Sequence, residues 1–369
     1  MGEPTLFTPI ELGGLTLKNR LLFAPTSLGL GEAEALERLR RIAAGGCAMI
    51  IVGDVPVGKR GPLSLYHKGG FGRYQRLCAA IHREGCLVCA QLHQSDSNWK
   101  ALVKYLPGVL AKKITPQDLR ARLNEQAGPY ITRLPLEQVE AITASFGPAA
   151  LLARQAGFDM VQIHGDRMCG SFSSALLNKR TDGYGGSPEH RARFAVEAVE
   201  AVRRALPEVP IDYKLAVRQE QPHYGNAGVL VEELPVFVPL LERAGVTSFH
   251  VTLADHGSLT DTIPPKQHPY FSEEGCFLRY CDQVRQYTAL PLCGVGGLSD
   301  PAFVERQLAE GRVDCVAMSR QLLADPAWPS KVRQGRPETI RRCVRCNRAC
   351  LGGMQRHEGV HCIYEEKGD

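Results

Sequence analysis

Four cysteines lie close together near the end of the sequence: Cys343, Cys346, Cys350 and Cys362. Their spacing is C-x2-C-x3-C-x11-C. A structural zinc site usually draws on two C-x2-C pairs that lie well apart in the chain. Three close cysteines and a distant one are more typical of an iron–sulfur cluster, although the spacing matches neither common ferredoxin pattern. The spacing therefore favours a cluster and leaves open zinc, or four unligated thiols.

Two loops, one rich in glycine and one that bears an arginine, suggest a second site, for a phosphate. The stretch GVGGLSDP holds Gly296 and Gly297, and the stretch MSRQLLADP holds Ser319 and Arg320. Glycines let backbone N–H groups approach phosphate oxygens, and arginine adds a bidentate positive charge. Turn glycines before a helix are the plain alternative for the first loop alone. The two loops together predict a phosphate-bearing cofactor.

The elements that would position these residues follow a repeating pattern. A helix-like segment ends in glycine, and a short apolar run follows, as in AAGGCAMIIV and RQAGFDMVQIH. Glycine suits a helix C-terminus, and an unbroken apolar run suits a strand covered on both faces. The pattern predicts eight parallel strands, near residues 20–24, 47–53, 86–91, 159–164, 211–216, 248–252, 291–294 and 313–317.

Eight such strands predict an α/β fold of the (β/α)8 TIM-barrel type with a C-terminal cysteine-rich segment. A doubly wound sheet is less favoured because no G-x-G-x-x-G follows the first strand. We predict a barrel over 1–335 and a cluster-binding segment over 336–369. Residues 95–130 fit no strand–helix unit, so we expect a long loop there, on the face where barrels place active sites. In a barrel, the two phosphate loops would follow the seventh and eighth strands, a common phosphate site.

Composition excludes several classes of protein. The 369 residues are 44% hydrophobic and 22% charged, with a net charge of +5, which is ordinary for a globular chain and gives no sign of nucleic-acid binding. No apolar run is long enough for a membrane span or a secretion signal. Five cysteines stand in or beside apolar runs that read as buried strands: Cys47, Cys86, Cys89, Cys293 and Cys315. Free buried thiols indicate a reducing, cytoplasmic compartment.

Several stretches resemble the old yellow enzyme family. They are LFTPIELGGLTLKNRLLFAPTS, LPLEQVE followed by FGPAALLARQAGFDMVQIHG, and LLNKRTDGYGGSPEHRARF. The tail CVRCNRACLGGM resembles one branch, the 2,4-dienoyl-CoA reductase and trimethylamine dehydrogenase type. That resemblance covers nearly the whole chain. It implies FMN in the barrel and a [4Fe–4S] cluster held by the four tail cysteines.

The resemblance also assigns FMN contacts residue by residue. It places a hydroxyl of Ser27 near flavin N5 and O4, the Gln91 amide at the pyrimidine edge, and Lys214 near N1 and O2. A cation there suits a reduced flavin, which is anionic at N1. The full implied set adds the first-strand loop and the end of the second strand: Pro25, Thr26, Ser27, Gly53, Gln91 and Lys214.

The substrate end departs from the family pattern. The stretch IHGDRMCGSF carries His164 at the first of two positions that usually polarise a carbonyl, but Arg167 at the second. Cys169 stands where the family has a proton-donating tyrosine, and Asp166 or Arg167 is a candidate to orient the substrate. His256, after the sixth strand, aligns with a histidine that dienoyl-CoA reductases use near their substrate. A thiol is a conceivable acid, although buried cysteines are more often inert.

Together these features predict an ene-reductase that reduces an activated C=C bond of a small molecule. Two alternatives stay open: an amine dehydrogenase of the trimethylamine dehydrogenase type, and an electron-transfer subunit with a decayed pocket. Long relatives continue into FAD and NAD(P)H domains, and this chain carries no dinucleotide fingerprint. We therefore expect a separate flavoprotein subunit or ferredoxin to feed the cluster, and the sequence leaves homo- or hetero-oligomers open.

Basic residues around the cysteines suit either a solvated face or docking of an acidic electron carrier. They are Lys331, Arg333, Arg336, Arg341, Arg342, Arg345 and Arg348.

Overall fold

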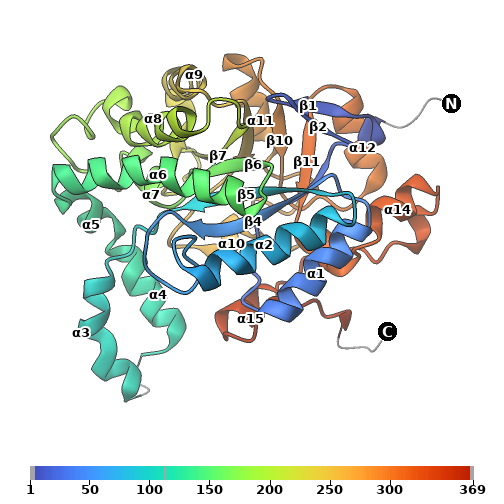
Figure 1. Cartoon of the computed structure of the whole chain (residues 1–369), viewed down its shortest axis with the longest axis horizontal. Coiled ribbons are helices and arrows are strands. Elements are labelled where there is room, and N and C mark those ends of the chain that lie inside the picture. The colour runs from blue at the N-terminus through green and yellow to red at the C-terminus, as the bar shows by residue number, and fades with distance from the viewer. Residues whose placement is uncertain (1–4, 112–113, 366–369) are drawn as a thin grey trace.

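The computed structural model describes residues 5–111 and 114–365, and its centre is a closed parallel barrel (Figure 1). Neighbouring strands follow the order β6-β5-β4-β3-β11-β10-β9-β7, and a further β6–β7 pairing closes the ring. All eight predicted strands are present: β3 (Leu21–Phe23), β4 (Met49–Pro56), β5 (Leu87–His93), β6 (Met160–His164), β7 (Ile211–Arg218), β9 (Ser248–Thr252), β10 (Leu292–Gly294) and β11 (Cys315–Met318). The predicted (β/α)8 fold is confirmed.

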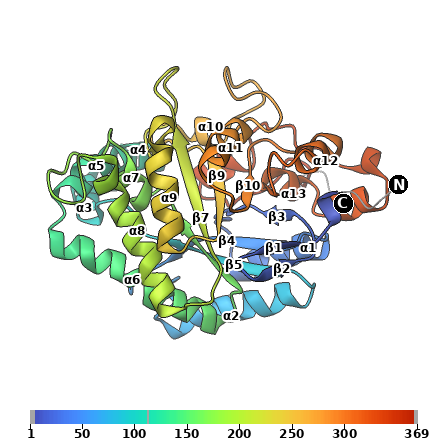
Figure 2. The same ribbon diagram turned by 90° about the horizontal axis from the view of Figure 1, so that it is seen from above.

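Strand composition explains this arrangement. Most strand residues are apolar and buried on both faces, because the barrel interior lies on one side and the helices lie on the other (Figure 2). The long covering helices are α1 (Glu32–Ala44), α2 (Lys68–His82), α6 (Leu136–Ala156), α8 (Pro188–Ala205), α9 (Leu234–Ala244) and α12 (Pro301–Ala309). Ser187 and Asp300 cap α8 and α12 with their side chains, and Gly157 and Gly245 end α6 and α9 in the left-handed conformation.

Short elements complete the barrel. A hairpin of β1 (Ile10–Leu12) and β2 (Leu15–Leu17) packs Leu12 and Leu17 against the apolar residues at one end of the barrel interior. The sequence pattern missed this hairpin, and also the two-residue strand β8 (Val229–Leu230) beside β7. Further short helices are α7 (Met168–Ser173), α10 (Leu259–Thr262), α11 (Leu278–Val284), α13 (Arg320–Ala324) and α14 (Trp328–Arg333).

The segment after β5 corrects the sequence prediction. Residues 95–130 are not a long irregular loop, because they contain α3 (Trp99–Leu110), α4 (Pro116–Glu125) and the start of α5 (Ala127–Arg133). Thr115 and Asp118 form a reciprocal capping box that starts α4. Figure 1 shows α3 and α4 projecting from the barrel at the lower left.

The C-terminal segment turns back over the barrel mouth. Its helix α15 (Leu351–Gln355) lies beside the loop that follows β3, and Val360 N donates to Leu28 O at 2.7 Å. Arg38 of α1 donates to Val360 O, so the segment is fastened to the first helix as well. Within the described ranges, no helix has the length and hydropathy that a membrane span requires.

Candidate active site

A cavity of about 660 Å³ opens at the C-terminal ends of the barrel strands. Its wall includes every residue that the sequence assigned to FMN: Pro25, Thr26, Ser27, Gly53, Gln91, Lys214, Gly296, Gly297, Ser319 and Arg320. These residues come from six different strand ends, and the barrel geometry brings them together because all parallel strands end on one face. The proposed cofactor residues therefore share one site.

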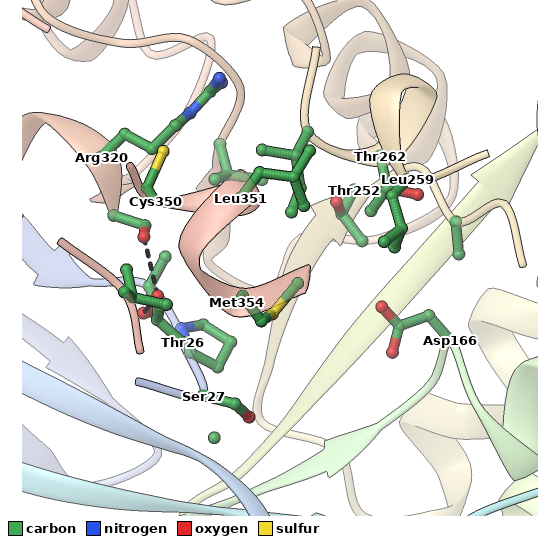
Figure 3. A pocket seen from close by; sticks show the side chains of 18 of the residues that line it. Thr26, Ser27, Asp166, Thr252, Leu259, Thr262, Arg320, Cys350, Leu351 and Met354 are labelled. Carbon is green, nitrogen blue, oxygen red and sulfur yellow. Dashed lines mark hydrogen bonds between the residues drawn. The ribbon is translucent and has the colours of Figure 1, made fainter. Parts of the chain in front are cut away.

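Close backbone approach explains the glycines of this site. A Cβ added to Gly53 would lie 3.1 Å from Thr26 N, so a side chain there would press on the first-strand loop. Gly296 and Gly297 have φ of 118° and 66°, values that L side chains rarely adopt. At the eighth strand, Thr26 Oγ1 donates to Ser319 Oγ at 2.8 Å and ties the first and last loops together (Figure 3).

Polar atoms without partners indicate that the cavity is built to hold ligands. His250 and His256 are 1% and 5% exposed and both line the cavity. Within the described chain, Nδ1 of His250 has no hydrogen-bond partner, whereas Nδ1 of His256 lies 3.4 Å from Asp96 Oδ2. Burial lowers the pKa of His250 to about 3, so its ring is neutral and Nδ1 or Nε2 is an open acceptor. Buried polar atoms are usually paired, so His250 points to a bound group.

Arg320 lies between this cavity and the four tail cysteines. Its guanidinium donates to Pro264 O at 2.9 Å and to Asn347 Oδ1 at 2.7 Å. Burial lowers the pKa of Arg320, while the thiols of Cys343 and Cys350 oppose that effect. Figure 3 shows Arg320 beside Cys350, turned away from Ser27. The positive charge of Arg320 therefore lies toward the cysteine site as much as toward the predicted phosphate site.

The four tail cysteines surround a second, smaller cavity. Cys343 and Cys350 line both this cavity and the large one, so the two sites share a wall. Four thiolates on one zinc ion would lie about 3.8 Å apart, given a zinc–sulfur distance of about 2.3 Å. Among the described residues, no three of these sulfurs lie within 4.8 Å of one another. These thiols are therefore spaced more widely than four ligands of one zinc ion would be.

His164 is held between two carboxylates at the end of β6. Its Nδ1 lies 3.4 Å from Asp54 Oδ1 and its Nε2 contacts Asp166. Burial alone would lower the pKa of His164, but Asp166 and Asp54 outweigh it, and the pKa is raised. Its neighbour His93, at 2.8 Å between the Nδ1 atoms, has its pKa lowered to about 4 by burial. His164 is therefore the protonated ring of the pair, and neutral His93 accepts its hydrogen bond.

Arg167 stands at the substrate end on a buried carboxylate. Its Nη2 lies 3.0 Å from Asp96 Oδ1, and it also donates to Asn124 Oδ1 at 3.4 Å. Asp96 has a fully buried side chain, whereas Arg167 keeps 21% of its side chain exposed. Burial raises the pKa of Asp96, yet the charge of Arg167 and the hydrogen bond from Ser171 bring it below its usual value. Arg167 is thus a fixed cation at the edge of the cavity.

His256 is anchored by the backbone around it. Its Nε2 lies 2.6 Å from Asp166 O, and its own N–H donates to Asn226 Oδ1 at 2.8 Å. Burial lowers its pKa, so the ring is neutral and donates from Nε2. Its carbonyl accepts a 2.6 Å hydrogen bond from Asn124 Nδ2, which links it to α4.

Cys169 does not reach the site. Its side chain is 1% exposed, it lies in α7, and it is absent from the wall of the cavity. Burial holds the pKa of this thiol well above its usual range. The structure therefore does not bring Cys169 together with the other candidate catalytic residues at the cavity wall.

Sequence reasoning missed several residues of the cavity wall. Asp54 and His93 lie at the ends of predicted strands, so the strand-end rule could have found them. Asn124 comes from α4 and Met354 from α15, whose positions over the mouth no local pattern reveals. Figure 3 shows Met354 lying between Thr26 and Asp166.

Comparison with known proteins identifies the cofactor of this barrel. Residues 5–339 match the NADH:flavin oxidoreductase / NADH oxidase family. The chain belongs to this family. It is an FMN-dependent oxidoreductase, and the resemblance to the old yellow enzyme family is confirmed. The glycine-lined cavity with its phosphate loops and buried cation fits the cofactor of this family.

Individual relatives are similar over most of the chain. It is 61% identical to a bilirubin reductase of Clostridium symbiosum, over 97% of both chains. A bilirubin reductase of Mediterraneibacter gnavus is 34% identical over 97% of this chain, which spans 56% of that relative. Among solved structures, a 2-naphthoyl-CoA reductase complex has a TM-score of 0.79 at 22% identity, over 98% of this chain and 56% of that one. That structure supports the fold.

Proposed function

We propose that this protein is a flavin-dependent reductase that adds two hydrogens across a conjugated C=C bond of bilirubin or a related open-chain tetrapyrrole. The observation that carries the proposal is the 61% identity to the Clostridium symbiosum bilirubin reductase over 97% of both chains. The cavity supports it, because beyond the residues assigned to FMN its wall carries Asp166, Arg167 and His256, polar groups that suit a polar conjugated ligand.

Bilirubin is a linear tetrapyrrole with two methine bridges, each conjugated to a lactam carbonyl, a central methylene bridge, and two propionate side chains. Reduction of one bridge needs a hydride on one carbon, a proton on its neighbour, and a group to stabilise the oxygen that gains charge. FMN, when bound, supplies the hydride. The other two tasks fall to residues of this chain.

His164 is our assignment for the proton donor. It replaces the missing tyrosine, because its two carboxylate neighbours keep the ring protonated, while Cys169 is buried outside the cavity wall. The Nδ1 proton, which His164 shares with His93 in the absence of substrate, passes to the substrate carbon and leaves a neutral imidazole, which regains a proton from solvent. Asp166 holds the ring from its Nε2 side throughout.

Arg167 is our assignment for the group that binds the substrate oxygen. A guanidinium suits a lactam carbonyl or a propionate, and Asp96 and Asn124 fix its direction. His256 completes this wall and is held by Asp166 O. Lys214 pairs with Asp166 at 3.1 Å, which links the substrate residues to the proposed flavin cation.

We also propose that residues 336–369 hold a [4Fe–4S] cluster through Cys343, Cys346, Cys350 and Cys362, and that its electrons pass to FMN. The shared wall of the two cavities supports this path. A separate electron-donor protein would dock nearby, where Arg342, Arg348 and half-exposed Val344 lie at the surface. Arg345 is excluded from that face because it is buried on the carbonyls of Phe271 and Ser272.

The thiols support our proposal of a reducing, cytoplasmic compartment. All thirteen cysteines are free, and nine are buried, among them Cys47 and Cys86 with their sulfurs 3.7 Å apart. Such thiols persist unoxidised where glutathione and thioredoxin keep them reduced.

The alternative functions find less support in the cavity. Amine dehydrogenases that bind cations use aromatic cages, but among the described lining residues Phe277 is the only phenylalanine, tyrosine or tryptophan. An electron-transfer subunit with a decayed pocket would not need a cavity lined by carboxylates, an arginine and several histidines.

The test is an anaerobic assay of reconstituted protein with a chemical or photochemical electron source. We expect consumption of bilirubin. In a separate arm, oxidised protein is mixed with dimethylamine and an artificial electron acceptor, because amine oxidation releases electrons, and we expect little reduction of that acceptor. NADH or NADPH alone should reduce the FMN slowly, because we assign electron entry to the cluster. Fast turnover of dimethylamine with no loss of bilirubin would overturn the proposal.

A further inference from the structure

One buried chain of hydrogen bonds leads from the cavity into the barrel interior. Gln91 Nε2 donates to Gln162 Oε1 at 2.7 Å, and Gln162 Nε2 donates to Asp212 Oδ2 at 2.6 Å. Ser248 Oγ donates to the other carboxyl oxygen of Asp212 at 2.6 Å. At the cavity end, Gln91 Oε1 accepts from Asp54 N at 3.3 Å.

The chain is a layer of the barrel itself. Gln91 is the register partner of Gln162, Gln162 that of Asp212, and Asp212 that of Ser248, on four adjacent strands. Their exposures are 2%, 0%, 5% and 2%, so water does not compete for these bonds. Barrel interiors are normally filled with branched apolar residues, so four polar side chains at one level call for a reason.

Asp212 determines the direction of every bond in this chain. No cation pairs with it among the described residues. Burial raises the pKa of Asp212 to about 6, although the hydrogen bonds from Ser248 and Gln162 act in the opposite direction. An ionised carboxylate only accepts hydrogen bonds, so Gln162 must turn its NH2 group toward Asp212 and its oxygen toward Gln91. Gln91 must then turn its own NH2 toward Gln162, which leaves Oε1 as the acceptor facing Asp54 N and the cavity.

We propose that Asp212 is a positioning residue that acts through Gln162 to fix the orientation of the Gln91 amide toward FMN. The uracil-like edge of a flavin has one N–H, at N3, between two carbonyls. A fixed acceptor at Gln91 matches that N–H, and a flipped amide would place N–H against N–H. The inference rests on the assignment of Gln91 to the flavin and not on the identity of the substrate.

Asp212→Asn is the first test, because asparagine keeps the shape but can donate to Gln162 and so permits both amides to flip. We expect the FMN dissociation constant of the apoprotein, measured by flavin fluorescence, to rise about five- to tenfold, as for one hydrogen bond lost. The infrared carbonyl bands of 13C-labelled FMN should shift. Ser248→Ala is the matched control when both variants are assayed at alkaline pH: loss of this donor raises the pKa of Asp212 further, but there Gln162 still faces a carboxylate. We expect a change in FMN affinity below about twofold.

The double variant Q162E/D212N provides the rescue. It moves the accept-only carboxylate one position along the chain, so Gln91 again donates to residue 162 and keeps its orientation. We expect FMN affinity and the carbonyl bands to return to wild-type values. The inference would be overturned if D212N kept wild-type FMN affinity and carbonyl bands, or if S248A lost as much FMN affinity as D212N. It would also be overturned if the double variant folded but did not recover FMN affinity. These readouts need no bilirubin, so they are independent of the proposed reaction.

Discussion

Replacement of Arg167 can distinguish a role of this cation in catalysis from a role in stabilising the fold. Arg167→Ala removes the guanidinium that lies 3.0 Å from the fully buried side chain of Asp96. Breaking a buried ion pair from one side costs about 3–5 kcal/mol. Because Arg167 is itself 21% exposed and Ser171 still donates to Asp96, we expect the lower end, about 3 kcal/mol of unfolding free energy.

The same change should slow the reaction by a different amount. A hydrogen bond to a charged group contributes about 1.5–3 kcal/mol. If Arg167 holds the charge that develops on the substrate oxygen, kcat/KM for bilirubin should fall roughly 10- to 150-fold. Arg167→Lys keeps the charge without the planar fork and should lose less.

A double variant distinguishes the two effects. In D96N/R167A, the buried side chain at position 96 is neutral, so denaturant unfolding should recover most of the lost stability, and the introduced amide oxygen can still accept from Ser171. Turnover should stay low because the guanidinium is absent. Recovery of kcat/KM together with stability in D96N/R167A would show that Arg167 only supports the fold, and our assignment would be refuted.

Three further changes test other parts of the site. Asp54→Asn removes one carboxylate that raises the pKa of His164. Protonated His164 is present only below its pKa, so the alkaline limb of the pH profile of kcat should move to lower pH. If that limb does not move, His164 is not the acid. Asn124→Ala removes the hydrogen bonds that join α4 to Arg167 and to His256 O, so KM for bilirubin should rise several-fold while FMN affinity stays unchanged. The control is Glu125→Ala, at an exposed neighbouring position, which should behave as wild type. Cys362→Ser should lower iron content and electron transfer to FMN, with bound FMN retained; full iron occupancy would remove Cys362 from the ligand set.

The barrel could be predicted from the sequence because its signals are local. Strands follow glycine-capped helices, as at Gly157 and Gly245, and every predicted strand position was confirmed. Strand ends converge on one face by topology, so the residues assigned to FMN share a cavity. The capping box of Thr115 and Asp118 is also a local sequence signal, and it predicts the start of α4 within the segment that we expected to be a loop.

Contacts between distant segments could not be predicted in this way. Asn124 bonds His256 O across 132 positions, and nothing in its neighbourhood marks it. Arg345 looks like one more basic residue of the tail, yet it has a φ of 52° and is buried among backbone carbonyls. Whether an arginine is buried or exposed depends on which hydrogen-bond acceptors the fold brings near it, and the local sequence does not contain that information.

The most direct measurement is a single anaerobic turnover. Protein holding FMN and the cluster is photoreduced and mixed with one equivalent of bilirubin in a stopped-flow spectrometer. We predict that the absorbance of oxidised flavin returns at the rate at which the bilirubin band disappears, and that R167A slows both equally. A flavin that stays reduced while bilirubin persists would contradict the account.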